Sequence, residues 1–236
     1  MSDTGSSFNQ YIAPMLGSDD RQFAPATQRN REPILEVLLQ VLPPTGTVLE
    51  ISSGTGEHAV FFAPRLQPRL WIPSDPNPIA RASIAAWRQQ VSAANLLAPI
   101  ALDASDSVWP IEQAELPQAL QGLNLQQNPI EAIVNINMIH IAPWSACLGL
   151  FAGARRILSA GGILYLYGPF KQGGQHTAPS NEAFDASLQA QNAAWGVRDL
   201  DDVVAVAQAH NFTLTQAIAM PANNLSVVFQ AEGQSR

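Results

Sequence analysis

A short segment with two glycines, between an expected strand and an expected helix, limits the fold of this chain more than any other feature. Residues 47–52 are rich in β-branched residues, Ser53-Gly54-Thr55-Gly56 follows, and apolar residues return at helical spacing over 57–66. A strand, a glycine turn and a helix in this order form the first unit of an open, mostly parallel α/β sheet. The segment therefore predicts a ligand site at the carboxyl end of the first strand.

The alternation of strands and helices continues along the chain. Further strands are expected over 70–73, 98–102, 132–139 and 163–167, with helices over 31–42, 79–93, 110–123, 144–158 and 200–210. Such alternation implies a parallel sheet with helices on both faces and ligands beyond the carboxyl ends of the strands. Two last strands, over 212–220 and 225–231, are joined by four residues and predict an antiparallel hairpin.

Charge and cysteine content exclude several classes of function. The chain has 12 Lys and Arg against 19 Asp and Glu, and no basic run that could follow a phosphate backbone, so nucleic acid is not expected as a partner. The single cysteine, Cys147, excludes an internal disulfide. No apolar run approaches the ~20 residues that cross a bilayer, and no secretory signal is apparent. We expect a cytoplasmic protein without membrane contact.

The glycine segment by itself fits two cofactors. Gly54, Gly56 and Ala59 have the G-x-G-x-x-A spacing of dinucleotide-binding loops, and Asp75 follows about twenty residues later, where a ribose would be bound. Against this, three residues lie between Glu50, at the strand end, and Gly54, which makes the loop longer than the usual dinucleotide turn, and no arginine follows closely to meet a pyrophosphate. Asp103, after the third expected strand, adds a carboxylate that could accept a hydrogen bond from an adenine amine. An NAD-dependent dehydrogenase stays the remote alternative.

The pattern resembles class I S-adenosylmethionine-dependent methyltransferases. Their motifs correspond to Glu50-x-x-x-Gly54-x-Gly56, Asp75, Asp103, Leu158-Ser159-Ala160-Gly161-Gly162-Ile163-Leu164 and the closing hairpin. The resemblance implies a Rossmann-like fold with a seven-stranded, mostly parallel sheet, an antiparallel C-terminal hairpin and helices on both faces. It also implies S-adenosyl-L-methionine as cofactor and S-adenosyl-L-homocysteine as product, with Asp75 on the ribose and Asp103 on the adenine.

A narrower resemblance rests on shorter motifs. These are Arg29-Asn30-Arg31-Glu32-Pro33-Ile34-Leu35, Asn137-Met138-Ile139-His140-Ile141-Ala142-Pro143-Trp144, Tyr167-Gly168-Pro169-Phe170, Ser180-Asn181, Trp195-Gly196-Val197-Arg198-Asp199 and Pro221-Ala222-Asn223-Asn224. They resemble the family, labelled a domain of unknown function, that includes methyltransferase-like protein 26. The family resemblance supplies the cofactor and leaves the methyl acceptor open.

Candidate site residues follow from the motifs and their positions. The residues expected to bind the cofactor are Arg31, Glu50, Ser52, Gly54, Thr55, Gly56, Asp75, Asp103 and Asn137. His140, just after the fourth expected strand, is the candidate general base, because imidazole titrates near neutrality. The alternative for His140 is that it orients a loop or packs under Trp144. The four histidines have no local metal-ligand spacing, so no metal is expected.

A polar segment over 171–198 is expected to form a lid that selects the acceptor. The candidate acceptor-binding residues are Tyr167, Phe170, Asn181, Trp195 and Arg198. Aromatic walls with one arginine suit a small, partly apolar molecule that carries a carboxylate. Phe170 and Trp195 fit a place in the core equally well.

The domain organisation that we expect is simple. Residues 1–26 form a segment that is flexible or covers the cofactor, and 27–236 form the methyltransferase domain. We expect methyl transfer to a small molecule; a protein side-chain methyltransferase and a non-catalytic S-adenosylmethionine-binding scaffold are the alternatives. Whether the chain forms a homodimer stays open.

Overall fold

The computed structural model describes residues 19–233 and contains one central sheet of six strands in the order β2-β1-β3-β4-β9-β8. The strands are β1 (Thr47–Ile51), β2 (Leu70–Ser74), β3 (Ile130–Ile136), β4 (Ile163–Gly168), β8 (Phe212–Met220) and β9 (Asn224–Ala231). The first four run parallel, β9 is antiparallel to β4, and β8 is antiparallel to β9. The predicted parallel core and the antiparallel C-terminal hairpin are therefore confirmed, with the last strand inserted between β4 and β8.

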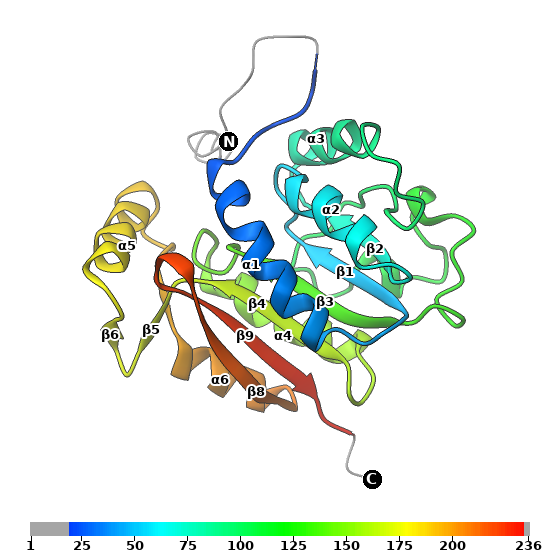
Figure 1. The fold of residues 1–236 in the computed structure, drawn as a ribbon. Helices are drawn as coiled ribbons and strands as arrows, with labels where there is room; N and C mark the ends of the chain where they lie inside the picture. The colour runs from blue at the N-terminus through cyan, green and yellow to red at the C-terminus, as the bar shows by residue number, and fades with distance from the viewer. Residues whose placement is uncertain (1–18, 234–236) are drawn as a thin grey trace, which may run out of the picture.

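Helices cover both faces of this sheet. They are α1 (Pro25–Val41), α2 (Glu57–Phe62), α3 (Pro78–Arg88), α4 (Trp144–Ile157) and α6 (Leu200–Ala209). In Figure 1, α1 and α2 lie in front of the sheet, and α4 and α6 lie behind it. Alternate residues of β1 enter the two resulting cores, because strand side chains point to opposite faces: Val48 packs with α1 and α2, and Leu49 packs with α4.

The third expected strand, over 98–102, is not a strand in the structure, so the central sheet has six strands instead of the expected seven. This segment follows β2 with only two isolated parallel bridges, Trp71 with Leu96 and Ser74 with Ile100. Pro99 lies between the bridged residues and has no backbone N–H, so a continuous ladder cannot form there. The segment still runs alongside β2 as a strand would. Asp103 therefore lies beside the carboxyl ends of β1 and β2.

Two expected helices also differ from the prediction. The first helix begins at Pro25 instead of residue 31, since proline is accommodated in a first turn and the Ala24 N–H is held by the Glu57 carboxylate at 2.5 Å. The segment 110–123 forms two short 3₁₀ turns, Pro110–Glu112 and Gln118–Leu120, because Pro117 interrupts it. The prediction that residues 1–26 cover the cofactor falls largely on residues outside those described.

The lid expected over 171–198 is a small unit beside the sheet. It contains β5 (Phe170–Gln172), β6 (Gln175–His176), α5 (Pro179–Gln191) and β7 (Arg198–Asp199), with a three-stranded sheet in the order β6-β5-β7. Figure 1 shows α5 and β6 projecting away from the central sheet. Asp185 ties α5 to this unit: its carboxylate accepts the Val197 N–H at 2.8 Å and pairs with the Lys171 ammonium at 2.8 Å.

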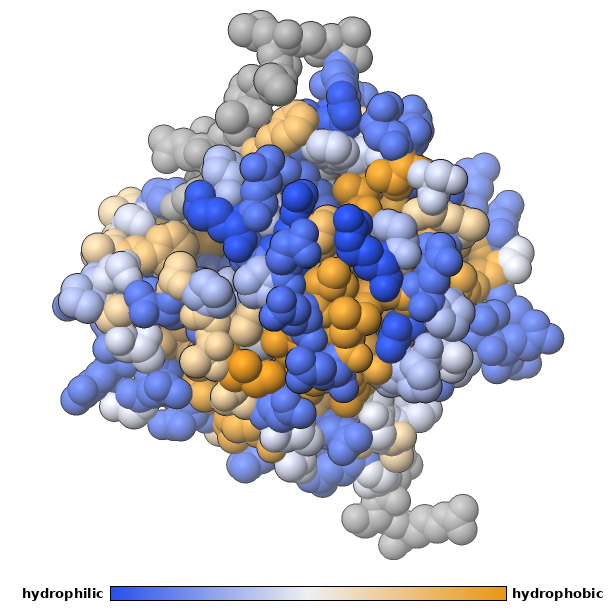
Figure 2. Space-filling model, in the orientation of Figure 1, coloured by the Kyte–Doolittle hydropathy of each residue, from blue (hydrophilic) through white to orange (hydrophobic). Residues whose placement is uncertain are grey.

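The surface of the front face is mixed in character. Figure 2 shows hydrophobic residues in the middle of this face, surrounded by hydrophilic ones. Leu39 of α1 has 54% of its surface exposed. Within residues 19–233, no helix has the length and apolar character needed to cross a membrane.

Candidate functional site

The loop after β1 is shaped by three residues with positive φ. Ser52 has φ 57°, Gly54 has φ 57° and Gly56 has φ 87°. The Gly54 N–H donates to Asp75 Oδ2 at 3.0 Å, which fixes the loop to the end of β2. A Cβ on Gly56 would lie 2.8 Å from Ile84 Cα, so only glycine allows α3 to pack this closely. Gly56 therefore shapes the loop and does not line the site.

Three carboxylates lie around this loop, and we call Glu50, Asp75 and Asp103 the carboxylate end of the site. Glu50 is the fourth residue of β1, Asp75 follows β2, and Asp103 follows the segment that continues the sheet edge. Glu50 and Asp75 are 1% and 2% exposed, whereas Asp103 is exposed to solvent. The parallel arrangement brings the three together because the strands end at the same edge of the sheet.

Burial changes the acidity of two of these groups. Burial raises the pKa of Glu50 to about 7, against the effect of its hydrogen bond from Trp71 Nε1 at 2.9 Å. Burial likewise raises the pKa of Asp75, although its carboxylate accepts the N–H groups of Asn77 and Gly54. A cation or a set of hydroxyl donors beside these carboxylates would stabilise their charged forms.

The carboxylate end opens into a cavity of about 1020 Å³. Its lining residues are Ala24, Pro25, Ala26, Thr27, Arg29, Asn30, Glu50, Ser52, Ser53, Gly54, Thr55, His58, Asp75, Pro76, Asn77, Asp103, Ala104, Ser105, Ile136, Asn137, Met138, His140, Ile141, Ala142, Pro143, Ala146, Tyr167, Pro169, Ser180, Asn181, Phe184, Ala222, Asn223 and Asn224. They come from all parts of the fold, and α1 forms one wall. The cavity is at the upper end of the size range of small-molecule sites.

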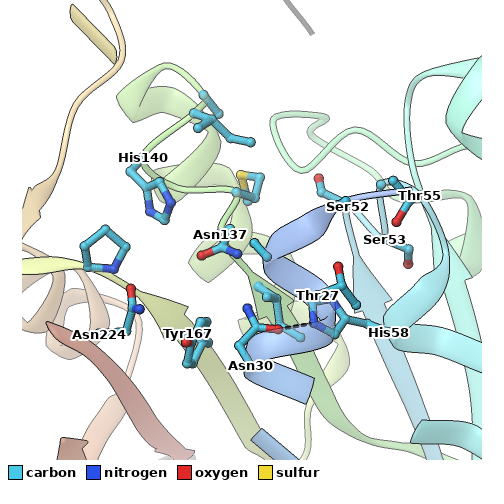
Figure 3. Close-up of a pocket in the computed structure, with 18 of the residues that line it drawn as sticks. Thr27, Asn30, Ser52, Ser53, Thr55, His58, Asn137, His140, Tyr167 and Asn224 are labelled. Atoms are coloured by element: carbon cyan, nitrogen blue, oxygen red, sulfur yellow. Dashed lines mark hydrogen bonds between the residues drawn. The ribbon is translucent and has the colours of Figure 1, made fainter. Parts of the chain in front are cut away.

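The other side of the cavity is polar but uncharged. We call Asn30, Tyr167, Asn181, Asn223 and Asn224 the amide end. Figure 3 shows Tyr167 and Asn224 together with Asn137 and His140 on one side of the cavity, and Ser52 and Thr55 on the other.

The residues of the amide end hold one another in place. The side-chain amides of Asn30 and Asn224 lie near the Tyr167 hydroxyl and act to lower its pKa, against burial, which raises it. Asn181 Nδ2 donates to the Asn223 carbonyl at 2.9 Å, and Asn223 Nδ2 donates to Ser180 Oγ at 3.1 Å. The lid helix α5 is thereby joined to the turn between β8 and β9.

His140 is buried, 2% exposed, and lines the cavity. Its Nδ1 has no hydrogen-bond partner among the described residues. Burial, assisted by the positive charge of Arg198, lowers its pKa to about 3, so the imidazole is neutral at neutral pH. A Cβ on Gly168 would lie 2.6 Å from His140 Cε1, so the ring depends on glycine at that position. A buried nitrogen without a partner indicates a place for a ligand group.

Backbone strain also concentrates here. Among the described residues, five that are not glycine have a positive φ, and four of them line the cavity: Ser52, Asn137, Ala222 and Asn223. Such conformations persist only where the surroundings hold them, and they are frequent at functional sites. Asn137 is held by its N–H, which donates to the Tyr167 carbonyl at 2.9 Å.

Nine further residues proposed from the sequence also line this cavity. They are Glu50, Ser52, Gly54, Thr55, Asp75, Asp103, Asn137, Tyr167 and Asn181. Together with His140 they bring the expected cofactor and acceptor residues to one site.

Five proposed residues lie outside the cavity lining. Gly56 packs against α3, and Phe170 is 1% exposed within the core. Trp195 is 8% exposed and is also packed away from the cavity. Arg31 lies over the Phe61 ring, with its guanidinium carbon 4.6 Å from the ring centre.

Arg198 is the fifth, and the guanidinium that was expected to meet an acceptor carboxylate is bonded to backbone carbonyls. Its guanidinium donates to the carbonyls of Ile139 at 2.9 Å, Ala142 at 2.7 Å and Ala194 at 2.9 Å. These bonds hold the loop after β3 against the lid. They leave Arg198 with a role in fixing backbone and not in facing an acceptor.

Several lining residues were not singled out from the sequence. Asn30, Asn223 and Asn224 fall in motifs that were recognised, but a helix start and a tight turn explained them equally well. His58 lies behind Asn30, with Nε2 2.8 Å from Asn30 Oδ1 (Figure 3), and burial lowers its pKa to about 3. Phe184 of α5 carries no motif signal, and only the packing of the lid brings it to the cavity. Across the described residues, no three His, Cys, Asp or Glu side chains are grouped to hold a metal.

A family model described as "Protein of unknown function (DUF938)" matches residues 21–231. The match spans most of the chain, including both ends of the cavity. The chain belongs to this family.

Solved structures of methyltransferases share the fold. An O-methyltransferase family protein from Burkholderia thailandensis matches with a TM-score of 0.69 at 11% identity, over 89% of this chain and 58% of that one. Human N-acetylserotonin methyltransferase, in complex with S-adenosylmethionine, matches with a TM-score of 0.66 at 12% identity, over 88% and 53%. An O-methyltransferase family 2 protein from Planctomyces limnophilus, in complex with apigenin, matches with a TM-score of 0.65 at 16% identity, over 87% and 59%. The chain spans little more than half the length of these proteins, and identities this low establish the fold alone.

Proposed function

We propose that this DUF938 protein is an S-adenosylmethionine-dependent methyltransferase that acts on a small molecule. The observation that carries the proposal is the carboxylate end: Glu50, Asp75 and Asp103 surround the glycine loop and face one cavity. This arrangement favours a ligand that offers positive charge and hydroxyl donors.

The charges at this end distinguish the two cofactors that the loop spacing allows. S-adenosylmethionine carries a sulfonium and an ammonium, and the buried Glu50 and Asp75 suit such cationic groups and the ribose hydroxyls. NAD carries a pyrophosphate with two negative charges, which three nearby carboxylates would repel. Arg29, exposed at the cavity wall, is the one Lys or Arg among the described lining residues, and it suits the carboxylate of the methionyl group.

The roles of the chain's residues follow from their positions. When bound, S-adenosylmethionine supplies an electrophilic methyl group. Asp75 would hold the ribose, since it is already fixed by the Gly54 and Asn77 N–H groups, and the exposed Asp103 would accept from the adenine amine. Thr55 and Ser52, which face the cavity in Figure 3, offer hydroxyl groups beside the loop.

His140 is the residue that we propose to meet the acceptor. His140 lines the cavity, and its neutral ring can accept a hydrogen bond from the group to be methylated. A neutral imidazole avoids repulsion by a cationic cofactor, and with a pKa of about 3 it orients the acceptor without holding a proton beforehand. Positioning is therefore its main contribution, with proton uptake only as the methyl group is transferred.

The shape of the cavity favours a small acceptor over a protein side chain. The start of α1, residues 24–30, closes one wall, and Asn181 and Phe184 of the lid close another. The volume of about 1020 Å³ provides room for the cofactor and a second small molecule.

Calorimetry with two ligands tests the cofactor. We expect S-adenosylhomocysteine to bind with a Kd in the micromolar range, roughly −8 kcal/mol, and NAD to show no heat of binding. Binding of NAD without binding of S-adenosylhomocysteine would overturn the proposal. Turnover is then tested with methyl-labelled S-adenosylmethionine and a metabolite extract, where absence of any labelled product would leave a binding protein instead of an enzyme.

A further inference from the structure

The amide end differs from the rest of the cavity in having no ionic side chain. Its five residues are four asparagines and Tyr167, and burial raises the Tyr167 pKa above its ordinary value, so the phenol is neutral. The charged side chains among the described lining residues are Glu50, Asp75, Asp103 and Arg29. An ionised group placed at the amide end would therefore lose its hydration without gaining a partner of opposite charge.

Tyr167 lines the cavity as a protonated phenol. Burial raises its pKa, against the opposite effect of the nearby side-chain amides of Asn30 and Asn224. Asn30 is itself oriented, because its Oδ1 contacts His58 Nε2 at 2.8 Å. The Tyr167 hydroxyl can therefore donate a hydrogen bond to a ligand group in the cavity.

The histidines on either side add no charge. His58 and His140 are both buried, 8% and 2% exposed, and both have a pKa lowered to about 3. His140 and Tyr167 line the same cavity, one with a neutral imidazole and the other with a protonated hydroxyl. Figure 3 shows the two side chains on the same side of the cavity, with Asn137 between them.

We infer that the methyl acceptor is an uncharged molecule that donates an O–H or N–H to His140 and accepts a hydrogen bond from Tyr167 through a second polar atom. This inference rests on the proposed function and excludes carboxylic acids and amines that are ionised at neutral pH. In the transfer, the acceptor atom forms a bond to the methyl carbon and gives up its proton to His140. The electron pair of the broken carbon–sulfur bond stays on sulfur, which leaves S-adenosylhomocysteine.

Ion exchange provides the direct test. A small-molecule cell extract is separated into anionic, cationic and uncharged pools, and each pool is incubated with the full chain and methyl-labelled S-adenosylmethionine. We expect labelled product from the uncharged pool. Label confined to the anionic or cationic pool overturns the inference and leaves the proposed function standing. If no pool is labelled while S-adenosylhomocysteine still binds, the proposed methyl transfer fails and the inference fails with it; if S-adenosylhomocysteine does not bind, the proposed cofactor fails as well.

A pair of tyrosine variants tests the role of Tyr167. Tyr167→Phe keeps the ring and removes the donor, so KM for the labelled acceptor should rise about fivefold, as the loss of one neutral hydrogen bond predicts, with the Kd of S-adenosylhomocysteine unchanged. Tyr165→Phe is the matched control, because Tyr165 lies on the same strand and its hydroxyl bonds to Ser226 Oγ at 2.6 Å, away from the cavity. Equal KM values for the wild type and Tyr167→Phe would contradict the inference.

A charge variant provides a second, independent readout. Asn224→Asp keeps the size of the side chain and adds a carboxylate to the amide end. Turnover of the uncharged acceptor should fall roughly fivefold or more, and amines from the cationic pool should gain turnover relative to the wild type. A fall in turnover that is equal for all three pools would indicate a structural effect only and would count against the inference.

Discussion

The two ends of the cavity are built in different ways. The carboxylate end comes from the ends of β1 and β2 and from the bridged segment that runs beside β2, so that its residues lie within 54 positions of sequence, from Glu50 to Asp103. The amide end is assembled from α1, β4, α5 and the turn between β8 and β9, so its residues span most of the chain. One end is anionic and partly open; the other is neutral, with Tyr167 and Asn181 buried.

This difference has a physical consequence. A parallel sheet places the ends of neighbouring strands together whatever the rest of the chain does, so the carboxylate end is a property of the fold. The amide end exists only when the lid and the terminal hairpin are docked, since Asn181 bonds to the Asn223 carbonyl. We therefore expect the family fold to determine the donor site, and this chain's particular loops to determine the acceptor site.

The largest effect is expected from Asp75→Ala. This change removes the acceptor of the Gly54 N–H and the proposed partner of the ribose hydroxyls. Loss of two hydrogen bonds to a charged group predicts a Kd for S-adenosylhomocysteine that is weaker by roughly a thousandfold, measured by calorimetry. Asp106→Ala, an exposed carboxylate outside the cavity lining, is the control and should bind as the wild type does. Equal affinities for the two variants would remove Asp75 from the cofactor site.

A pH-dependent effect is expected from Glu50→Gln. In the unfolded chain the Glu50 pKa is near 4.5, and in the folded protein it is about 7, so between these values the folded state binds more protons. The contribution of Glu50 to the stability of the fold is thus fully present below pH 4.5 and is lost as the pH rises through 7. The rise in the Glu50 pKa on folding corresponds to roughly 3 kcal/mol of free energy of unfolding.

Denaturant unfolding at pH 5 and pH 8 measures this contribution. The difference in free energy of unfolding between Glu50→Gln and the wild type should favour the variant more at pH 8 than at pH 5. His58 and His140, whose pKa values are lowered to about 3, act in the opposite sense, because their stabilisation is present above pH 6.5 and is lost as the pH falls towards 3. Their effect is common to both proteins and cancels in the difference. A pH-independent difference would contradict the buried state of Glu50.

Gly168→Ala should affect the two ends of the cavity differently. The added Cβ would lie 2.6 Å from His140 Cε1, so the imidazole must move. Displacing the imidazole from the acceptor predicts a fall in kcat of roughly 30-fold, about 2 kcal/mol of activation free energy, while the Kd of S-adenosylhomocysteine stays within twofold. Gly233→Ala, whose Cβ would meet Ala160 Cβ at an ordinary 4.0 Å, serves as the control. An equal loss of cofactor binding and turnover would mean that the two ends are not independent.

The smallest effect is expected from Asn223→Gly. Glycine keeps the positive φ of 58° at this position and removes the side-chain bond to Ser180 Oγ. One exposed neutral hydrogen bond predicts a rise in the acceptor KM of about threefold, with cofactor affinity unchanged. Steady-state kinetics measure it, and a fall in cofactor affinity instead would show that the lid also supports the carboxylate end.

The sequence predicted much of the fold because its signals were local. The glycine loop, the strand–helix alternation and the two final strands each depend on neighbouring residues, and each is present in the structure. The errors came from prolines: Pro99 reduced an expected strand to two bridges, and Pro117 divided an expected helix into short turns. In both places proline lacks a backbone N–H, so hydrogen bonds of the predicted strand or helix cannot form.

For the site, a physical difference separates the residues that the sequence predicted from those that only the structure located. Sequence determined the carboxylate end, because a motif on each strand end names its residue and the parallel sheet brings the ends together. Only the tertiary structure decided the opposite side of the cavity: it turned Arg198 onto three backbone carbonyls, packed Phe170 into the core and placed Asn30 and Asn224 near Tyr167. Which way a side chain points at the junction of four elements depends on long-range packing, and no local pattern in the chain encodes that packing.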